Sequence, residues 1–442
     1  MENRNPMEYK PVFPLLMSMA IPPMISMLIQ SLYNIIDSIF VSQLGEEALT
    51  AVSLIFPLQN LSLAISCGIG IAMNAFIARH LGAKDDNKAS YYATQGIVMS
   101  LAHSLLFLII GLFFIRPFLN MFTTNQNVIN YGMQYGMIVV SLVIGQFIHL
   151  AIEKMFQATG NMMMPMIMQI FGAVINIILD PILIFGWFGL PRMGVTGAAI
   201  ATVIGQFCGM MIGYWITKKK IDALEIKVSN FSFSTDILAR IYKVGVPAIL
   251  MQSVLSFMTV FMNMILAPIS AMAISAFSVY YKLQNFLNMA VLGITNALIP
   301  IVAYNNGAKR KDRAFEAISF SMVLSISIMV VGTIVFQLFP KQLLSMFSAN
   351  DEMYAFGVPA LKIISLSFVF AGISMVLCAA FQALNKANTS LVITLARQLV
   401  ILIPLTYGLM KCFGINMGWY AFVVTEIICS VYSLIVWRKM KR

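Results

Sequence analysis

The sequence predicts an all-α polytopic membrane protein of about twelve transmembrane helices in two repeated six-helix bundles. The 442 residues are 60% hydrophobic and only 10% charged, whereas about a quarter of the residues of a soluble protein are charged. Apolar runs long enough to cross a hydrocarbon core of about 30 Å recur along the whole chain. The second half of the sequence also repeats the first at a constant spacing.

Twelve apolar segments make up most of the chain. We expect spanning helices at residues 14–41, 50–79, 92–115, 130–153, 163–187, 195–217, 244–267, 271–303, 317–339, 358–384, 388–410 and 416–437. The first segment is too long for the apolar region of a cleavable signal peptide, and it has no small-residue cleavage site. The N-terminus is therefore expected to stay in the cytoplasm.

The basic residues indicate the orientation of the helices. If the N-terminus faces inward, 21 of the 28 Lys and Arg residues fall in cytoplasmic segments, 5 fall in outer segments, and Lys282 and Arg397 lie inside spans. This bias follows the positive-inside rule, with both termini in the cytoplasm. We therefore assign the net charge of +11 to orientation in a plasma (inner) membrane and contact with anionic lipid, and not to nucleic-acid binding.

The repeat has a spacing of 225 residues. It aligns Pro22 with Pro247, Leu58-Gln59-Asn60 with Leu283-Gln284-Asn285, and Gly82-Ala83-Lys84 with Gly307-Ala308-Lys309. Polar triplets rarely match at one spacing by chance, so we infer a duplication. Six spans repeated with the same polarity predict an N-lobe at 1–217 and a C-lobe at 243–442, joined by a cytoplasmic linker at 218–242. Two such parallel bundles can rock around a central cavity.

Four of the seventeen acidic residues lie within spans or at their edges: Asp37, Glu153, Asp180 and Glu426. An ionised carboxylate in the middle of a bilayer costs at least about 2.5 to 3.5 kcal/mol on insertion scales, so intramembrane acids are candidates for function. Glu153 adjoins Lys154 near a cytoplasmic end, where an interfacial ion pair is an equal alternative. Glu426, Lys282 and Arg397 are second-tier candidates for a polar cavity, and an intramembrane network or snorkelling are alternatives.

Asp37 and Asp180 each follow an amide by about one helical turn, after Asn34 and Asn176 respectively. Pro181 removes the hydrogen bond to the carbonyl group of Ile177, and Pro22 makes the first helix a candidate for bending. The acids, amides and freed carbonyl group predict a site for a small cation or for a shared proton. The alternative is that each aspartate caps a helix break or bonds to a neighbouring helix.

The repeat favours the functional interpretation. At the 225 spacing, the second half places Met262, Thr259, Ile401 and Leu405 where the first half has Asp37, Asn34, Asn176 and Asp180. An acid that the fold required would appear in both halves. Neither Asp37 nor Asp180 has an acidic equivalent in the second half.

Other chemistry finds little support in the sequence. His149 and Glu153 are four residues apart, but an isolated pair without the HExxH pattern is a weak metal signal. There is no P-loop, so uphill transport would use an ion gradient. We therefore expect no enzymatic activity, no catalytic residues and no cofactor.

Four stretches resemble the multidrug and toxic compound extrusion (MATE) family, in particular its proton-linked, DinF-like branch: "LYNIIDSIFVSQLGEEALTAVSLIFP", "GIGIAMNAFIARHLGAKD", "NIILDPILIFG" and "GVTGAAIATVIGQ". The resemblance implies twelve helices in two lobes, V-shaped around a cavity. It also implies export of amphipathic, often cationic compounds in exchange for H+ or Na+. We expect the protein to be a monomer.

The resemblance also assigns roles to residues. It implies that Asp37 is the coupling acid, that Asn176 and Asp180 line the same cavity, and that Thr202 matches a cavity threonine. Lys282 and Arg397 fall where similar sequences often carry a basic residue. The acids that sodium-linked members place in the seventh and tenth helices are missing, which favours H+, or Na+ held by Asp37, Asn176 and Asp180. The alternatives are a lipid-linked oligosaccharide flippase of the same superfamily, an intramembrane enzyme and a membrane receptor.

Overall fold

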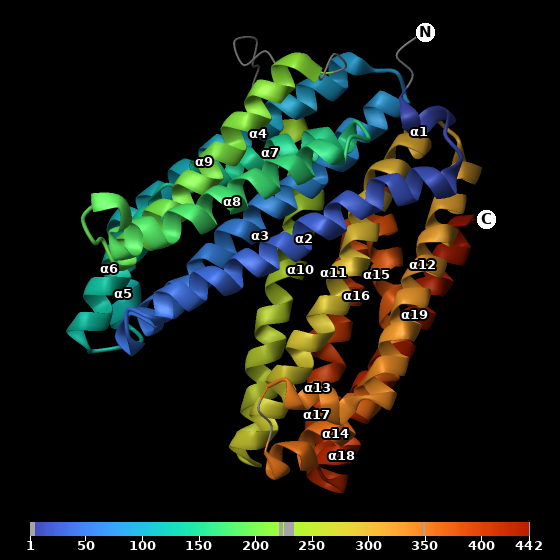
Figure 1. Cartoon of the computed structure of the whole chain (residues 1–442). Helices are drawn as coiled ribbons and strands as arrows, with labels where there is room; N and C mark the ends of the chain where they lie inside the picture. The colour runs from blue at the N-terminus through green and yellow to red at the C-terminus, as the bar shows by residue number, and fades with distance from the viewer. Residues whose placement is uncertain (1–4, 221–223, 225–233, 348–349, 442) are drawn as a thin grey trace. The chain divides into compact units, whose positions relative to one another are not determined.

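The computed structural model describes residues 5–220, 224, 234–347 and 350–441. Helices make up nearly all of this part of the chain (Figure 1). The chain forms two compact units: Ile25–Ile249 with Asn5 in the first, and Pro6–Met24 with the chain from Leu250 onward in the second. Much of the predicted linker at 218–242 lies outside the described residues, and the predicted lobe boundaries stay a prediction.

The helices of the first half follow one another with short connections. They are α1 (Pro6–Tyr9), α2 (Val12–Ser42), α3 (Glu46–Gly82), α4 (Asp86–Phe113), α5 (Ile115–Asn120), α6 (Gln126–Ser141), α7 (Ile144–Ala158), α8 (Met163–Phe185), the 3-10 helix η1 (Trp187–Gly189) and α9 (Val195–Lys220).

The helices of the second half follow a similar order. They are α10 (Thr235–Leu266), α11 (Ala271–Gly307), α12 (Lys311–Leu338), α13 (Pro340–Ser345), α14 (Asp351–Ser365), α15 (Phe368–Ala383), α16 (Ala387–Leu395), the π-helix η3 (Ala396–Val400), α17 (Leu402–Phe413), α18 (Ile415–Gly418) and α19 (Tyr420–Lys441). Among the described residues, the second half has no counterpart of α1, and α16, η3 and α17 stand in place of the single helix α8.

The predicted number of spans is confirmed. Among the described residues, 11 helices are long and apolar enough to cross a membrane, and counting the pair α14 and α15, bent by 53°, as one span gives twelve. The bend lies inside the segment predicted at 358–384. Apolar length predicts where the chain crosses, but it does not show where a crossing breaks.

The duplication extends to the bounds of the helices. Both ends of α3 and α11 differ by 225 residues, and so do both ends of α4 and α12. The residues after α3 and α11 repeat even an unusual backbone conformation, because Lys84 has a φ of 59° and Lys309 a φ of 60°. Positive φ is uncommon for a residue with a side chain, so the shared value supports a common origin for the two halves.

Helices α2 and α10 each belong to both units. The first unit ends along α10 at Ile249, and the second ends along α2 at Met24, which is 225 residues earlier. Each point follows a proline inside the helix, Pro247 in α10 and Pro22 in α2. The assignment of α2 as a helix continues through Pro22 without a break, and bending there stays a prediction.

A glycine packs against each helix at the residue where the unit ends, Gly68 against Ile249 and Gly293 against Met24. A Cβ atom at Gly68 would lie 2.5 Å from Ile249 Cγ1 and 2.8 Å from the carbonyl oxygen of Gly245. A Cβ atom at the equivalent Gly293 would overlap Met24 Cγ and lie 3.0 Å from the Met24 nitrogen. Glycine therefore permits the same close helix contact once in each unit.

Candidate functional site

Asp37 and Asp180 lie in the first unit, on α2 and α8. Asp180 is completely buried, at 0% exposure, and Asp37 is partly buried. The two carboxyl groups are close enough to interact electrostatically. The Oδ1 atom of each has no hydrogen-bond partner among the described residues. An acid with an unsatisfied buried oxygen is expensive for the fold, which indicates a role other than packing.

Asn176 connects Asp180 to α9. In the amide orientation that gives both ends a partner, Asn176 Nδ2 donates to Asp180 Oδ2 over 3.1 Å, and its Oδ1 accepts from the backbone N–H of Thr202 over 3.1 Å. Asn176 and Thr202 are 2% and 5% exposed. The structure therefore brings together three of the residues selected from the sequence.

Two glycines allow α8 and α9 to approach closely here. A Cβ atom at Gly205 would lie 2.7 Å from the carbonyl oxygen of Gly172 and 3.1 Å from Asn176 Cβ, and a Cβ atom at Gly172 would lie 2.9 Å from the carbonyl oxygen of Gly205. Larger side chains at these positions would separate the helices. The 3.1 Å hydrogen bond from the Thr202 N–H to the Asn176 amide oxygen depends on this close approach of α8 and α9.

Two tyrosines lie near the two acids, and a search of the sequence for charged residues does not find them. Tyr33 and Tyr135 each interact electrostatically with Asp37 and with Asp180. Gln59 Nε2 on α3 donates to the Tyr135 hydroxyl group over 3.4 Å. Tyr33 lies four residues before Asp37, a spacing that places the two on one helix face. Nothing in the sequence predicts that Tyr135 on α6 reaches the same place.

The other residues predicted beside the acids have different surroundings. Asn34 is exposed, and its side chain makes no hydrogen bond to either aspartate within the described part of the chain. Pro181 is buried inside α8, which continues past it to Phe185. The predicted roles of Asn34, Pro22 and Pro181 are not tested by these positions and stay predictions.

A second polar group of the first unit forms around Glu153. Lys154 Nζ lies 3.2 Å from Glu153 Oε1 and donates to Gln157 Oε1 over 3.0 Å. Gln157 Nε2 in turn donates to Glu153 Oε1 over 2.7 Å. Asn74 Nδ2 on α3 lies 3.4 Å from Gln157 Oε1, to which it also donates. Lys154 is therefore paired with an acid inside the bundle, and the choice between an interfacial ion pair and a functional role for Glu153 stays a prediction.

In the second unit, Arg397 and Glu426 neutralise each other. Arg397 Nε lies 2.7 Å from Glu426 Oε1, and the two side chains are only 11% and 10% exposed. Arg397 lies in the π-helix η3, and Glu426 on α19. The sequence identified both as deep charges but did not pair them.

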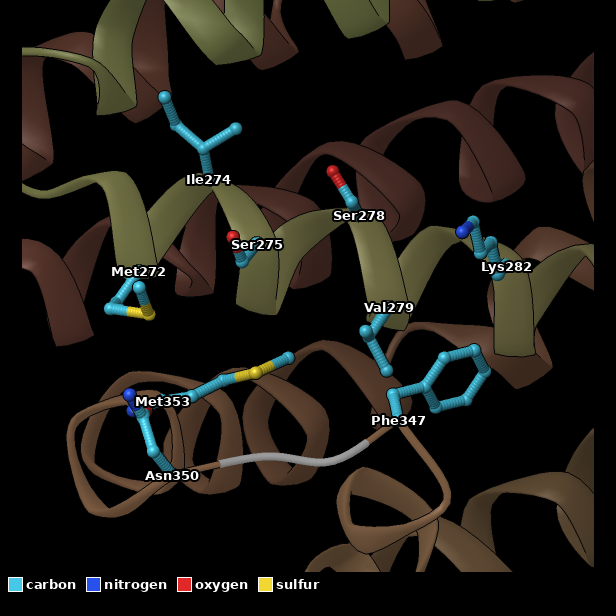
Figure 2. Close-up of a pocket in the computed structure, with 9 residues that line it drawn as sticks. All are labelled: Met272, Ile274, Ser275, Ser278, Val279, Lys282, Phe347, Asn350 and Met353. Carbon is cyan, nitrogen blue, oxygen red and sulfur yellow. The ribbon is translucent and has the colours of Figure 1, made fainter. Parts of the chain in front are cut away.

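Lys282 of α11 lies at a pocket of about 450 Å³ within the second unit. Figure 2 shows the pocket between α11 and the chain around the start of α14. Its lining consists of Met272, Ile274, Ser275, Ser278, Val279 and Lys282 on one side, and Phe347, Asn350 and Met353 on the other. Lys282 Nζ lies 6.0 Å from the centre of the Phe347 ring.

The described residues contain no group of three or more His, Cys, Asp and Glu side chains arranged to hold a metal ion. His149 is buried, and a Cβ atom at Gly209 would lie 2.7 Å from its Cε1 atom. The Na+ ligands proposed from the sequence are the oxygen atoms of two carboxylates and one amide. Such a set contains only two acidic residues and therefore falls outside a search for three.

Comparison with known proteins gives matches over the whole chain. The sequence model of the MatE family matches residues 22–182 and 247–408, once in each half. A multidrug export protein MepA of Staphylococcus haemolyticus is 25% identical over 97% of this chain and 94% of its own length. An FAD transporter of Shewanella oneidensis is 25% identical over 92% of this chain and 90% of its own.

Solved structures share the fold. A multidrug resistance MATE family transporter in an outward-facing conformation superposes with a TM-score of 0.91 at 24% identity, covering 100% of this chain and 98% of that one. A MOP superfamily transporter of Pyrococcus furiosus superposes with a TM-score of 0.90 at 23% identity, with the same coverage.

Proposed function

Because this chain belongs to the MatE family of membrane transporters, we propose that it is a cation-coupled antiporter that exports amphipathic, cationic compounds by alternating access. Two relatives are named as a multidrug export protein and an FAD transporter, which supports export of small organic molecules. The observation that carries the proposal is the interacting pair of acids, the completely buried Asp180 and the partly buried Asp37.

Two neighbouring carboxylates in a buried site repel each other when both are ionised, so the site favours a bound positive charge. A proton, a Na+ ion or the cationic group of a substrate can supply that charge. If only one of them is accommodated at a time, binding of one releases the other, which is the requirement for exchange. The coupling ion is H+, or Na+ held by Asp37, Asn176 and Asp180. Holding Na+ requires the Asn176 amide to turn its oxygen from Thr202 toward the ion.

The surroundings of the pair support its use as a switch. Asp180 is held by Asn176, while its other oxygen has no partner among the described residues. Asp37 is on a different helix and is less buried. A bound cation would satisfy the oxygen atoms that the protein leaves free, and its loss would restore the repulsion between the two acids. Thr202 positions Asn176 through its backbone.

The remaining proposals concern the setting. We place the protein in the plasma membrane as a monomer, with both termini in the cytoplasm, as the positive-inside bias predicts. An oligosaccharide flippase would need several cations for a pyrophosphate group. In the described part of the chain, Lys154 and Arg397 are paired with acids, so this alternative receives less support.

Ethidium export from proteoliposomes tests the proposal. We expect the wild-type protein to drive export under an imposed pH gradient or an imposed Na+ gradient, and the gradient that works identifies the ion. Asp37→Asn should abolish gradient-driven export while the protein still inserts and purifies as a single species. Export by this variant at the wild-type rate would overturn the proposal.

A further inference from the structure

Lys282 is a positively charged side chain at the pocket of the second unit, and the exchange proposed above gives it no role. Lys282 lies eleven residues after Ala271, the first residue of α11, which is about 16 Å along the helix axis. It is exposed, and no carboxylate lies within ion-pair distance among the residues that the structure describes. A lysine inside a spanning helix is costly against lipid, so it faces water or a polar ligand.

The pocket at Lys282 is lined by both polar and apolar side chains. Ser275, Ser278 and Lys282 follow one another at helical spacing on α11 and contribute hydroxyl groups and a positive charge. The apolar side chains of the same helix that line the pocket are Met272, Ile274 and Val279. On the opposite side, Phe347 and Met353 contribute apolar surface beside the Asn350 amide, as Figure 2 shows. A volume of about 450 Å³ falls within the range of pockets that bind small organic molecules.

The charge at this place belongs to one half only. The equivalent of Lys282 in the first half is Pro57, whereas Ser278 corresponds to another serine, Ser53. The fold therefore does not require a lysine at this position of the helix. As with the aspartates of the first unit, a costly charge that only one copy carries indicates a ligand of opposite sign.

We propose that this pocket of the second unit binds amphipathic molecules that carry a carboxylate, with Lys282 as the counter-ion and Phe347 and Met353 against the apolar part of the ligand. The proposal rests on the transport function proposed above and adds to it a second binding site, for compounds with an anionic group. The ammonium group pairs with the carboxylate, and the hydroxyl group of Ser278 lies on the same helix face to donate a second hydrogen bond.

Two fluorescent probes that differ in charge test the proposal on the full-length protein in detergent. Dansylglycine carries a carboxylate, and dansylamide is its neutral counterpart. Lys282→Gln should weaken the binding of dansylglycine about tenfold or more, as expected for the loss of a charged hydrogen bond. Lys282→Arg should retain most of the affinity because it keeps the charge. Neither variant should change the binding of dansylamide.

Lys411 supplies a matched control. It is an exposed lysine of the same unit, with its Nζ atom 5.7 Å from the centre of the Tyr407 ring, and it does not line the pocket. Lys411→Gln should leave the binding of dansylglycine unchanged. Equal affinities of wild type and Lys282→Gln for dansylglycine would overturn the proposal. An equal loss of affinity for both probes would also overturn it, because Lys282 would then act through packing.

Two further results separate a lipid ligand from a soluble carboxylate, and failure of this proposal from failure of the exchange proposal. If phosphatidylglycerol displaces dansylglycine at concentrations where 1-naphthoate does not, the pocket binds lipid, and the proposal of a soluble carboxylate ligand is wrong. Asp37→Asn should bind dansylglycine as the wild type does. Loss of export in that variant with no effect of Lys282→Gln on dansylglycine would leave the exchange proposal standing and remove this one.

Discussion

The two halves of the chain share their backbone contacts and differ in their charges. A Cβ atom at Gly132 would lie 2.7 Å from Leu119, and a Cβ atom at the equivalent Gly357 would lie 2.9 Å from the equivalent Leu344. The acid Asp37 of the first half, by contrast, corresponds to Met262, which is completely buried in the apolar core of the second unit. The fold requires the glycines at these contacts, and it does not require the acid.

The same difference applies to the groups around Asp37. Tyr33 and Tyr135 correspond to Met258 and Ala360, both of which belong to the apolar core of the second unit. Arg397 and Glu426 of the second half correspond to Gly172 and Ala201. Each half has therefore acquired its own polar cluster on a common scaffold, and the clusters can be changed separately from the fold.

Exchanging the residues at position 37 and its equivalent should have the largest effect. Met262→Asp places a carboxylate in a core position with 0% exposure, and it should destabilise the protein by at least about 3 kcal/mol. Asp37→Met should leave the thermal stability unchanged or higher, while removing gradient-driven export. Unfolding temperatures of the purified variants measure this, and equal destabilisation by both exchanges would contradict the comparison.

Breaking the buried ion pair between Arg397 and Glu426 should have the next largest effect on stability. Arg397→Met leaves Glu426 buried without its partner and should cost about 3 to 5 kcal/mol. The double variant Arg397→Met with Glu426→Leu should recover most of that loss, since a buried pair often contributes little more than apolar packing. Thermal unfolding of the single and double variants distinguishes this from a structural need for the arginine itself.

The glycine contacts should give smaller and equal effects. Gly68→Ala and Gly293→Ala each place a methyl group against backbone atoms of α10 and α2 respectively, and each should cost about 1 to 3 kcal/mol through overpacking. Gly408, where a Cβ atom would meet nothing within 4 Å, offers a control in Gly408→Ala. Strongly unequal losses at Gly68 and Gly293 would show that the two contacts are not equivalent.

Much of the fold could be predicted from the sequence because lipid imposes a simple rule. Spanning helices need about 20 apolar residues, so the apolar runs marked the twelve spans, and polar triplets at one spacing marked the repeat. The break between α14 and α15 and the π-helix at Ala396–Val400 could not be predicted, since both depend on packing against other helices and leave the apolar pattern intact.

The candidate site was predictable where charge was the signal. Asp37, Asn176 and Asp180 could be selected because acids are rare in apolar helices and recur at helical spacing with amides. Tyr135 could not be selected, because its position near Asp37 depends on how α6 packs in the first unit. The pairing of Arg397 with Glu426 across 29 residues likewise depends on tertiary contacts.

The central claim is that a substrate and the coupling ion compete for the acids of the first unit. The most direct test is to add ethidium to the purified protein in weakly buffered solution and to measure the protons released, with and without Na+. We expect proton release by the wild type and none by Asp37→Asn or Asp180→Asn. For Na+ coupling, we expect displacement of bound ²²Na+ with the same dependence on both acids. Ethidium binding that releases neither ion from the wild-type protein would contradict the claim.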